Sequence, residues 1–374
     1  MIKSILLKLF LGFLSIFIPL IIGIMAFINL SPQFGAAPAG NHLEIISKSQ
    51  NHNGKNFINL IPTSMDLDFK NGSKVMYKWL FEGKDREPGK PLPAQFAHPI
   101  NALNDSSSSI VTWYGHSAIS LEIDGKFILI DPMLGKAASP VPFMTKRFEY
   151  DQPIDLESIP KVDAVILSHD HYDHLDYPSI MKLKDKVGHF FTPLGVGSHL
   201  VKWGVEKSKI TELDWWETTE FDQLKLVATP ARHFSGRGIS DRNKTQWASW
   251  VIQGQHENIY FSGDSGYGPH FKEIGDNYGP FDFAMMECGQ YNKNWEAIHM
   301  LPEQTIQASI DVNANLMMPI HWGAFNLSLH SWTDPVERAL TAADAQNVTI
   351  ITPLIGQRFS PGKATKSTPW WRKF

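Results

Sequence analysis

An apolar run that ends in a cluster of metal-capable side chains constrains this chain more than any other stretch. Val162–Leu167 is almost wholly apolar and rich in β-branched residues, which predicts a buried strand. Four metal-capable residues lie within six positions just beyond it: His169, His171, Asp173 and His174. Open α/β sheets bind ligands beyond the carboxyl ends of their strands, and imidazole with carboxylate suits zinc, iron or manganese. We therefore expect a metal site here, with a polar surface loop as the alternative.

Length and charge narrow the class of protein. The chain has 374 residues, enough for one large or two small domains with a sizeable core. Its formal net charge of -4 leaves no basic footprint of nucleic-acid binding. Cys288 is the single cysteine, so no intramolecular disulfide can form, and the redox compartment stays open. Nothing in the sequence indicates an oligomeric state.

The N-terminus carries a segment suited to a membrane. Leu9–Ile28 is twenty residues without a charge, which matches the hydrocarbon core of a bilayer. Lys3 and Lys8 precede it and the next basic residue is Lys48, which predicts a cytoplasmic N-terminus and an extracytoplasmic (periplasmic) remainder. A cleaved signal sequence, with Ala37–Ala39 as its small-x-small site, is the alternative, but the run exceeds the usual apolar region of about 7–15 residues.

Composition divides the chain into four segments. Residues 1–30 are the expected membrane anchor, and residues 31–109, rich in Gly, Pro, Asn and Ser, predict an irregular lead-in that packs on the main domain. The main domain is expected over residues 110–360, and residues 361–374 form a tail. The aromatic, basic end of that tail, 369–374, could touch a bilayer surface, with a frayed terminus as the alternative.

The main domain alternates strand and helix signals. Strands are predicted at Ile110–Tyr114, Ala118–Ile123, Lys126–Ile130, Val162–Leu167, Gln223–Thr229, Trp247–Ile252, Asn258–Ser262, Phe281–Met286, Leu316–Ile320 and Thr349–Ile351. Helices are predicted at Leu175–Leu183, Pro302–Val312 and Pro335–Ala345. Asp124-Gly125 is a hairpin signal, and Asp334-Pro335 predicts a helix start with a capping aspartate. Strand-rich halves with helices outside imply a layered α/β sandwich (α+β by some schemes).

Three further candidate ligands each follow a predicted strand: His233, Asp264 and His321. Glycines beside Asp264 and His321 would let the backbone approach an ion closely. Each of the three alone is a weak signal, because a loop polar group is the ordinary alternative. Together with the first cluster they make seven candidate ligands, all at strand ends.

These residues resemble, motif by motif, the metallo-β-lactamase superfamily. Asp131 stands at the first motif, the residues from His169 to His174 at the second, and His233, Asp264 and His321 at the remaining three. The resemblance implies a four-layer αββα sandwich with a site for two zinc ions, iron or manganese being possible. It implies one metal on His169, His171 and His233. It implies the other on Asp173, His174 and His321, with Asp264 and a hydroxide bridging the two and Asp131 steadying the loop of the second motif.

Within the superfamily the chain resembles the branch of N-acyl-phosphatidylethanolamine-hydrolysing phospholipase D. The matching stretches are 32–35, 113–117, 230–234, 247–250, 263–267, 299–303 and 321–325. The resemblance implies a zinc-dependent phosphodiesterase acting on such phospholipids. The expected membrane anchor, Leu9–Ile28, is an addition to the pattern of that branch. A lactonase or other ester hydrolase with a small soluble substrate is the alternative. The sequence departs from the branch at 287–292, and Asp264 in place of the cysteine of well-known zinc β-lactamases argues against β-lactam hydrolysis.

The resemblance also suggests the catalytic residues. Asp173 and Asp264 would act through the metals, and His299 and His330 are candidates for protonating the leaving group, with a structural loop histidine as the alternative for each. His116 is expected to support the site rather than bind a metal. Five aromatic residues could seat acyl chains, core packing being their alternative role: Phe234, Tyr291, Trp295, Trp322 and Phe325.

Overall fold

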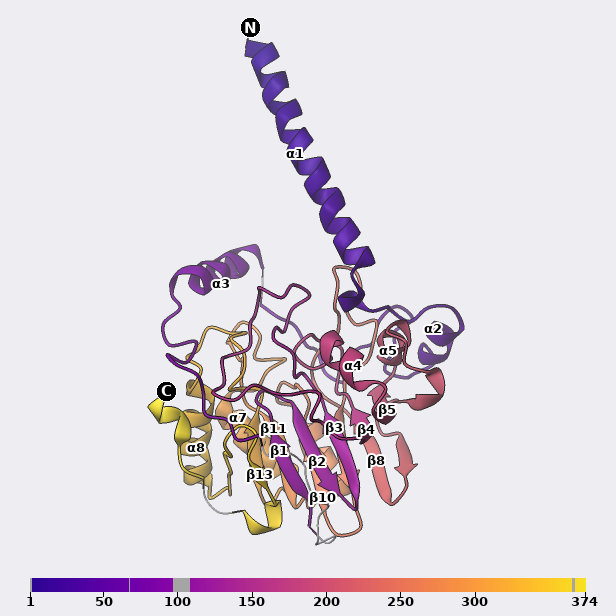
Figure 1. Ribbon diagram of the computed structural model, residues 1–374, viewed down its shortest axis with the longest axis vertical. Helices are drawn as coiled ribbons and strands as arrows, with labels where there is room; N and C mark the ends of the chain where they lie inside the picture. The colour runs from indigo at the N-terminus through magenta and orange to yellow at the C-terminus, as the bar shows by residue number, and fades with distance from the viewer. Residues whose placement is uncertain (1, 67, 97–107, 365–366) are drawn as a thin grey trace.

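Two β-sheets lie at the centre of the protein, seen here in a computed structural model that describes residues 2–66, 68–96, 108–364 and 367–374 (Figure 1). One sheet has the order β13 (Arg358–Phe359), β1 (Ile110–Trp113), β2 (Ile119–Ile123), β3 (Lys126–Ile130), β4 (Val162–Ile166), β5 (Val187–Pro193) and β6 (Ile210–Leu213). The other has the order β12 (Met317–Ile320), β11 (Phe283–Glu287), β10 (Asn258–Phe261), β9 (Ser249–Gln253), β8 (Leu224–Thr229) and β7 (Thr218–Phe221). Both sheets are mixed.

The strand directions bring several loops to one edge. In the first sheet β1, β2 and β3 pair antiparallel, and β3 to β6 pair parallel. In the second sheet β7 to β10 pair antiparallel, and β10 to β12 pair parallel. The predicted hairpin between β2 and β3 is confirmed, since Asp124 and Gly125 both have positive φ, 48° and 73°, as a type I′ turn requires. The carboxyl ends of β3, β4, β10, β11 and β12 carry the loops described below.

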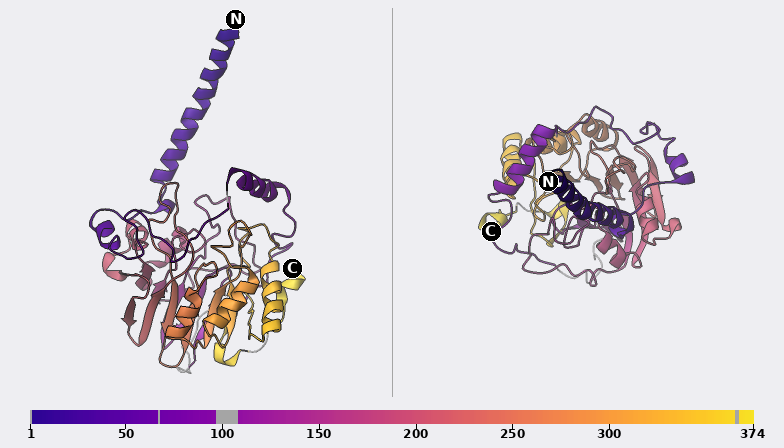
Figure 2. Two further views of the ribbon diagram at one scale, coloured as in Figure 1. Left: turned by 180° about the vertical axis from the view of Figure 1, so that it is seen from behind. Right: turned by 90° about the horizontal axis from the view of Figure 1, so that it is seen from above.

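Helices cover the outer face of each sheet. Helices α4 (Tyr177–Leu183) and α5 (Gly197–Lys202) pack on the first sheet, and α6 (His270–Tyr278), α7 (Pro302–Asp311) and α8 (Asp334–Gln346) pack on the second (Figures 1 and 2). In β4, Ala164 and Ile166 face the core between the sheets, whereas Val165 packs towards the helices. Strands buried on both faces read as continuous apolar runs. The predicted four-layer αββα sandwich is therefore confirmed.

Most strand predictions are confirmed, and several elements were missed. Nine of the ten predicted strands correspond to β1–β4 and β8–β12, whereas Thr349–Ile351 makes only an isolated bridge from Ile350 to Met317. No sequence pattern predicted β5, β6, β7 and β13, or α5 and α6. The prediction that Asp334 caps α8 is wrong, because Thr333 is the N-cap and Asp334 is the first helical residue. Its carboxylate instead accepts a hydrogen bond from the Tyr291 hydroxyl.

The prediction that the lead-in is irregular is only partly correct. It contains α2 (Gly40–Ile46), α3 (Phe69–Phe81) and a short 3-10 helix, Pro32–Phe34. Its first part is fastened to the first sheet and its helices. The Trp203 indole donates to Pro32 O at 2.7 Å, and His42 Nε2 lies 2.6 Å from Glu212 Oε2.

The C-terminal tail packs into the core. Trp370 and Trp371 are 6% and 1% exposed, and Trp370 stacks on Trp322 with ring centroids 5.7 Å apart. The Trp371 indole donates to Glu337 Oε1 at 2.7 Å. Both interpretations of these tryptophans, as a bilayer contact and as part of a frayed terminus, are therefore wrong.

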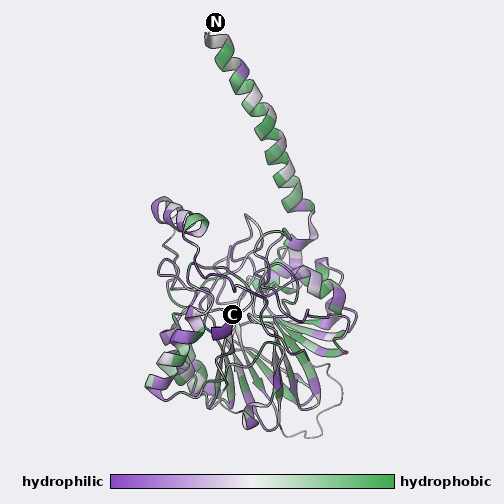
Figure 3. Cartoon of the chain, turned by 60° about the vertical axis from the view of Figure 1, so that its left-hand side comes forward, coloured by the Kyte–Doolittle hydropathy of each residue, from purple (hydrophilic) through white to green (hydrophobic). Residues whose placement is uncertain are grey.

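Helix α1 (Ile2–Leu30) projects away from the rest of the chain (Figure 1). Among the described residues it is the one helix long and apolar enough to cross a membrane, over Lys8–Leu30, a test that a signal sequence near the N-terminus also passes. Figure 3 shows its length as almost continuously hydrophobic. The predicted N-terminal apolar segment is thus a helix of spanning length.

Candidate metal centre

The loop between β4 and α4 carries the first four candidate ligands, and a buried carboxylate shapes each of its ends. Asp131, at the end of β3, accepts hydrogen bonds from Ser168 N at 2.7 Å and from Ser168 Oγ at 2.5 Å. At the other end Asp176 caps α4 by accepting from Ser179 N at 3.0 Å. Gly263 (φ +56°) allows the neighbouring loop to approach, because a Cβ there would lie 2.9 Å from Ser168 Cβ.

Three imidazoles converge on one side of the site. His171 Nδ1 lies 2.8 Å from His169 Nε2 and 3.2 Å from His233 Nε2. His233 Nδ1 donates to the carbonyl oxygen of Ile298 at 3.0 Å, so its Nε2 lone pair faces the other two rings. The side chains of His169 and His233 are 99% buried. This group can offer three nitrogen ligands to one cation.

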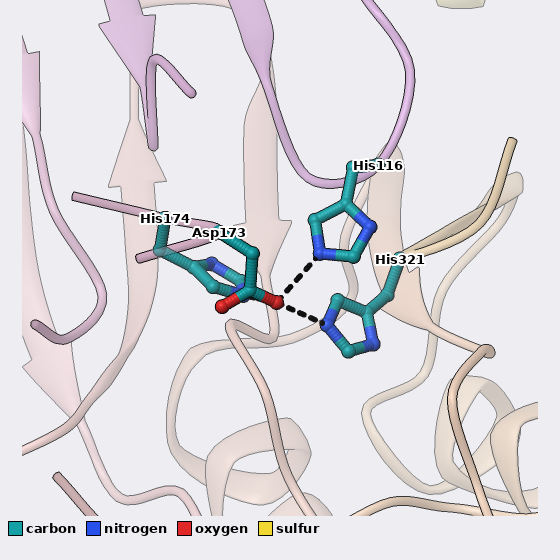
Figure 4. Close-up of side chains that lie close together, drawn as sticks. All are labelled: His116, Asp173, His174 and His321. Carbon is teal, nitrogen blue, oxygen red and sulfur yellow. Dashed lines mark hydrogen bonds and ion pairs between the residues drawn. The ribbon is translucent and has the colours of Figure 1, made fainter. Parts of the chain in front are cut away.

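A second group of side chains is drawn in Figure 4 and contains Asp173, His174 and His321. Asp173 Oδ2 lies 3.3 Å from His321 Nε2 and 3.6 Å from His174 Nε2. His174 Nδ1 donates to Asp131 Oδ2 at 2.7 Å, which turns its Nε2 lone pair inwards. His116 Nε2 donates to the same Asp173 oxygen at 2.8 Å, so that nitrogen is already engaged and the ring orients the carboxylate.

Asp264 stands between the two groups. Its Oδ2 atom lies 3.1 Å from both His174 Nε2 and His321 Nε2, and 3.9 Å and 3.8 Å from His169 Nε2 and His233 Nε2. One carboxylate therefore faces nitrogens of both groups. The structure thus brings all seven candidate ligands into one continuous cluster.

The polar atoms of this cluster fit a divalent cation. His174 Nε2 and Asp264 Oδ1 are fully buried and make no hydrogen bond, although His174 Nε2 lies close to the other carboxylate oxygen. Unpaired buried polar groups are costly. Nitrogen lone pairs directed at one another, as around His171, are likewise unfavourable unless a cation or a proton lies between them. The nitrogen and carboxylate donors are those that zinc accepts.

The charges of the site shift its pKa values in opposite directions. Burial lowers the pKa of a histidine, but the carboxylates of Asp264, Asp173 and Asp131 outweigh burial at His174 and raise its pKa to about 10. Burial would raise the pKa of Asp264, but His174 and His321 hold it well below its usual range. The pKa of His116 falls to about 3, through burial and then the neighbouring His321. His116 is therefore neutral at physiological pH.

The two candidate proton donors lie in different surroundings. His299 Nδ1 donates to Glu287 Oε1 at 2.9 Å, and its ring lies 5.0 Å from that of His321 and 5.1 Å from that of His233. His330 stacks on Tyr291 at 4.4 Å, and its Nδ1 lies 2.8 Å from Ser331 O. The structure therefore brings His299, and not His330, against the ligand rings.

Two supporting residues were missed by sequence reasoning. Glu287 ends β11, is fully buried, and lies with Oε1 3.6 Å from His321 Nδ1. Its position at a strand end was the signal that could have revealed it. Asn59, in the lead-in, donates to His233 O at 2.8 Å and accepts from His233 N at 3.1 Å. No local signal points to Asn59, because its partner lies 174 positions away.

The aromatic residues proposed as an acyl seat divide into two kinds. Trp322, Phe325 and Tyr291 are 1%, 2% and 5% exposed and belong to the core, so for these three the core-packing role is the one observed. Phe234 and Trp295 are half-buried, and the Phe234 ring lies 4.5 Å from that of His171. Phe234 is thus beside the first group of imidazoles.

Comparison with known proteins identifies the family. The family model described as the beta-lactamase superfamily domain matches residues 126–322, more than half of the chain. The chain belongs to the metallo-β-lactamase superfamily. It is a metal-dependent hydrolase of that superfamily, with the Asp and His cluster described above as its candidate metal-binding site.

Individual relatives refine this placement. An uncharacterised protein of Mycobacterium tuberculosis is 40% identical over 347 residues, 91% of this chain and 92% of that protein. N-acyl-phosphatidylethanolamine-hydrolyzing phospholipase D 1 of Caenorhabditis elegans is 30% identical over 264 residues, 67% of this chain and 74% of that protein. The resemblance to that branch is thereby confirmed. Among solved structures, an isothiocyanate hydrolase from Delia radicum gut bacteria shares the fold, with a TM-score of 0.53 and 22% identity over 67% of this chain and 99% of that chain.

Proposed function

We propose that the protein is a zinc-dependent, membrane-anchored phosphodiesterase that cleaves phospholipids resembling N-acyl-phosphatidylethanolamine. The observation that best supports this proposal is that a single side chain, Arg237, connects the end of the apolar helix α1 to the metal loop. Three residues beyond the end of α1, Gln33 O accepts from Arg237 Nε at 2.9 Å and from Nη2 at 2.7 Å. Arg237 Nη1 in turn donates to Leu175 O in the metal loop at 2.8 Å.

This connection favours a substrate that lies in the bilayer. The Phe34 ring packs edge-on against Tyr172 of the metal loop at 6.3 Å, and the Tyr172 hydroxyl donates to Arg237 O at 2.7 Å. If α1 is a retained anchor, it holds the metal-bearing edge of the sandwich at the membrane surface (Figure 1). The lipid concentration at the site is then high without tight intrinsic binding. Lys3 and Lys8 favour an extracytoplasmic hydrolase domain over residues 110–360.

We propose that each of the two groups of side chains holds one metal ion. His169, His171 and His233 would hold one ion, Asp173, His174 and His321 the other, and Asp264 would contact both. Two such ions, zinc by preference and iron or manganese by ligand chemistry, supply an activated water and a clamp for a phosphoryl oxygen.

Other side chains of the protein would orient the metal ligands and protonate the leaving group. His116 and Asp131 orient Asp173 and His174 through the hydrogen bonds already described. We assign the protonation of the leaving group to His299, because Glu287 fixes its Nδ1 as a donor and leaves Nε2 free to carry a proton. His330 is the weaker candidate, since it lies against Tyr291. Phe234 beside His171 would contact an acyl chain.

The test compares two substrates in one preparation. Zinc-loaded full-length protein is assayed on an N-acyl-phosphatidylethanolamine in mixed micelles and on a simple lactone, together with His169→Ala and the control His189→Ala. His189 pairs with Thr211 Oγ1 outside the site, so its loss should leave turnover near normal. We expect phospholipid turnover that is lost in His169→Ala. Efficient lactone hydrolysis with no cleavage of phospholipid would reject the lipid assignment and favour the small-ester alternative.

A further inference from the structure

Helix α3 exposes an unusual amount of apolar surface. Five large apolar or aromatic residues of this thirteen-residue helix are each 45% to 70% exposed: Met76, Tyr77, Trp79, Leu80 and Phe81. A contiguous apolar surface of this kind marks an interaction site more often than chance. An isolated helix of this length is also marginal in water. Its sequence therefore suits a helix that is stabilised by contact with something else.

The residues of α3 divide into an apolar face and a basic flank. Val75, Met76, Trp79 and Leu80 have the spacing of one helical face. Lys70, Lys74 and Lys78 repeat every four residues on the opposite side of the helix, which is its basic flank. The whole chain has a formal net charge of -4, so this basic flank is a local feature. Tryptophan and leucine opposite lysines are typical of helices that lie in the interface of a bilayer.

The place of α3 in the fold agrees with such a contact. Helix α3 lies at the end of the sandwich from which α1 leaves, and it runs across the direction of α1 rather than along it (Figures 1 and 2). Both of its ends are fastened. Asp66 N donates to Asn294 O at 2.7 Å before the helix, and Asp85 O accepts from Trp332 N at 2.9 Å after it. The helix is thus held in place while its apolar residues stay exposed.

Two loops next to the metal centre also expose apolar side chains. Ile239 is 78% exposed, in the loop that Arg237 fastens to the start of the lead-in. Phe143 is 72% exposed, in a loop closed by the bond from Ala138 N to Thr145 O at 3.0 Å. Ala138 packs with Phe325, whose ring lies 5.3 Å from that of His116. Both loops therefore border the metal centre, and their apolar side chains could contact the bilayer that α3 contacts.

We infer that α3 is a second membrane contact, which lies flat in the headgroup region of an anionic bilayer with Met76, Trp79 and Leu80 towards the acyl chains. Together with α1 it fixes the tilt of the sandwich, so that the metal edge faces the lipid. The inference holds whichever ester the site cleaves. The proposed anchor α1 matters to this inference in one respect: it determines which membrane α3 contacts.

The test measures the depth of α3 in the full-length protein. Met76→Cys is labelled with an environment-sensitive fluorophore and reconstituted in nanodiscs of phosphatidylcholine with phosphatidylglycerol. Cys288 is buried and should not compete for the label. Lys74→Cys, on the basic flank of the same helix, is the matched control. We expect acyl-chain nitroxides to quench the Met76 label at least about threefold more than the Lys74 label, and aqueous iodide to show the reverse order.

Three results would overturn the inference. Equal access of iodide to both labels would mean that the apolar face stays in water. A Met76 label shielded from both quenchers would mean that a protein, or a second copy of this chain, covers the face. Unchanged quenching after Lys70, Lys74 and Lys78 are all replaced by Gln would reject the role of anionic lipid. Bound zinc, measured in each variant, reports independently whether the metal centre is intact, so loss of the site is distinguished from loss of the contact.

Discussion

Replacing Asp131 by Asn should weaken zinc binding at one of the two metal sites much more than at the other. Asp131 is fully buried, and its two carboxylate oxygens accept hydrogen bonds from Ser168 N, Ser168 Oγ and His174 Nδ1. Asparagine has nearly the same shape but offers one acceptor oxygen and one donor group. If the amide oxygen keeps the bond to Ser168 N, the amide nitrogen faces His174 Nδ1. His174 can then accept that bond only by moving its proton to Nε2, the atom directed at Asp264.

The size of the effect follows from the bond that is lost. A hydrogen bond to a charged group contributes about 1.5–3 kcal/mol, and about 1.4 kcal/mol corresponds to tenfold in a binding constant. Partners that orient metal ligands typically change metal affinity about 10–100-fold when they are replaced. We therefore expect Asp131→Asn to weaken the zinc site of Asp173, His174 and His321 about 10–100-fold. The site of His169, His171 and His233 should change by much less.

Zinc removal by chelator competition would measure both affinities. The control is Asp163→Asn, because Asp163 also accepts a backbone bond, from Phe127 N at 2.9 Å, but lies at the other end of β4. Wild type and control should lose their two ions at similar chelator concentrations, and Asp131→Asn should lose one ion much earlier. Equal weakening of both sites, or none, would refute the reasoning from the His174 tautomer.

The remaining predictions test other parts of the site and the fold. Asp264→Ala should lower turnover by at least about 10²–10³-fold and reduce bound zinc at both sites; near-normal turnover measured by steady-state kinetics would contradict the dinuclear arrangement. The pKa of His174 is raised to about 10, so it contributes stability to the zinc-free chain that is complete below about pH 6.5 and is lost as pH rises through about 10. Zinc must displace that proton, so zinc affinity should rise at least about tenfold per pH unit between pH 6.5 and 8, and a flat profile in chelator titrations would show that His174 is not a ligand. Trp371→Ala should cost about 3–5 kcal/mol in urea unfolding, because the side chain is 1% exposed, whereas a solvent-exposed tail would show almost no change. A reporter joined after Phe374 by a flexible linker should be active outside the cytoplasm, and activity confined to the cytoplasm would overturn the proposed orientation.

The sequence was informative about the metal cluster for a simple geometric reason. Parallel strands end at the same edge of a sheet, so polar residues that follow several such strands meet there even when they are distant in the chain. His169, Asp264 and His321 follow β4, β10 and β12, and each strand is an apolar run that the sequence displays directly. The same rule applies to Glu287 at the end of β11. The sequence singled out Glu287 only as the start of the departure from the related branch, and its supporting role was missed.

Other features depend on contacts that no local pattern encodes. Trp370 and Trp371 resemble an interfacial pair in sequence, and only the presence of Trp322 and Glu337 in the fold makes their site apolar and hydrogen-bonded. Strand β7 alternates between exposed and half-buried residues, so its apolar signal is weak. Helix α3 was missed because its lysines and glycine dilute an apolar stripe that never enters the core.

Arg237 links the end of α1 to the metal loop. It is 3% exposed, and its guanidinium donates to Gln33 O after α1 and to Asp170 O and Leu175 O in the metal loop. It also stacks on the Tyr172 ring, 4.0 Å from the centroid. A planar guanidinium holds several acceptors in fixed directions, which a flexible ammonium cannot do. Together with the Phe34–Tyr172 contact, this guanidinium holds the metal loop against the end of α1, so a bilayer around α1 would meet the site at a fixed height.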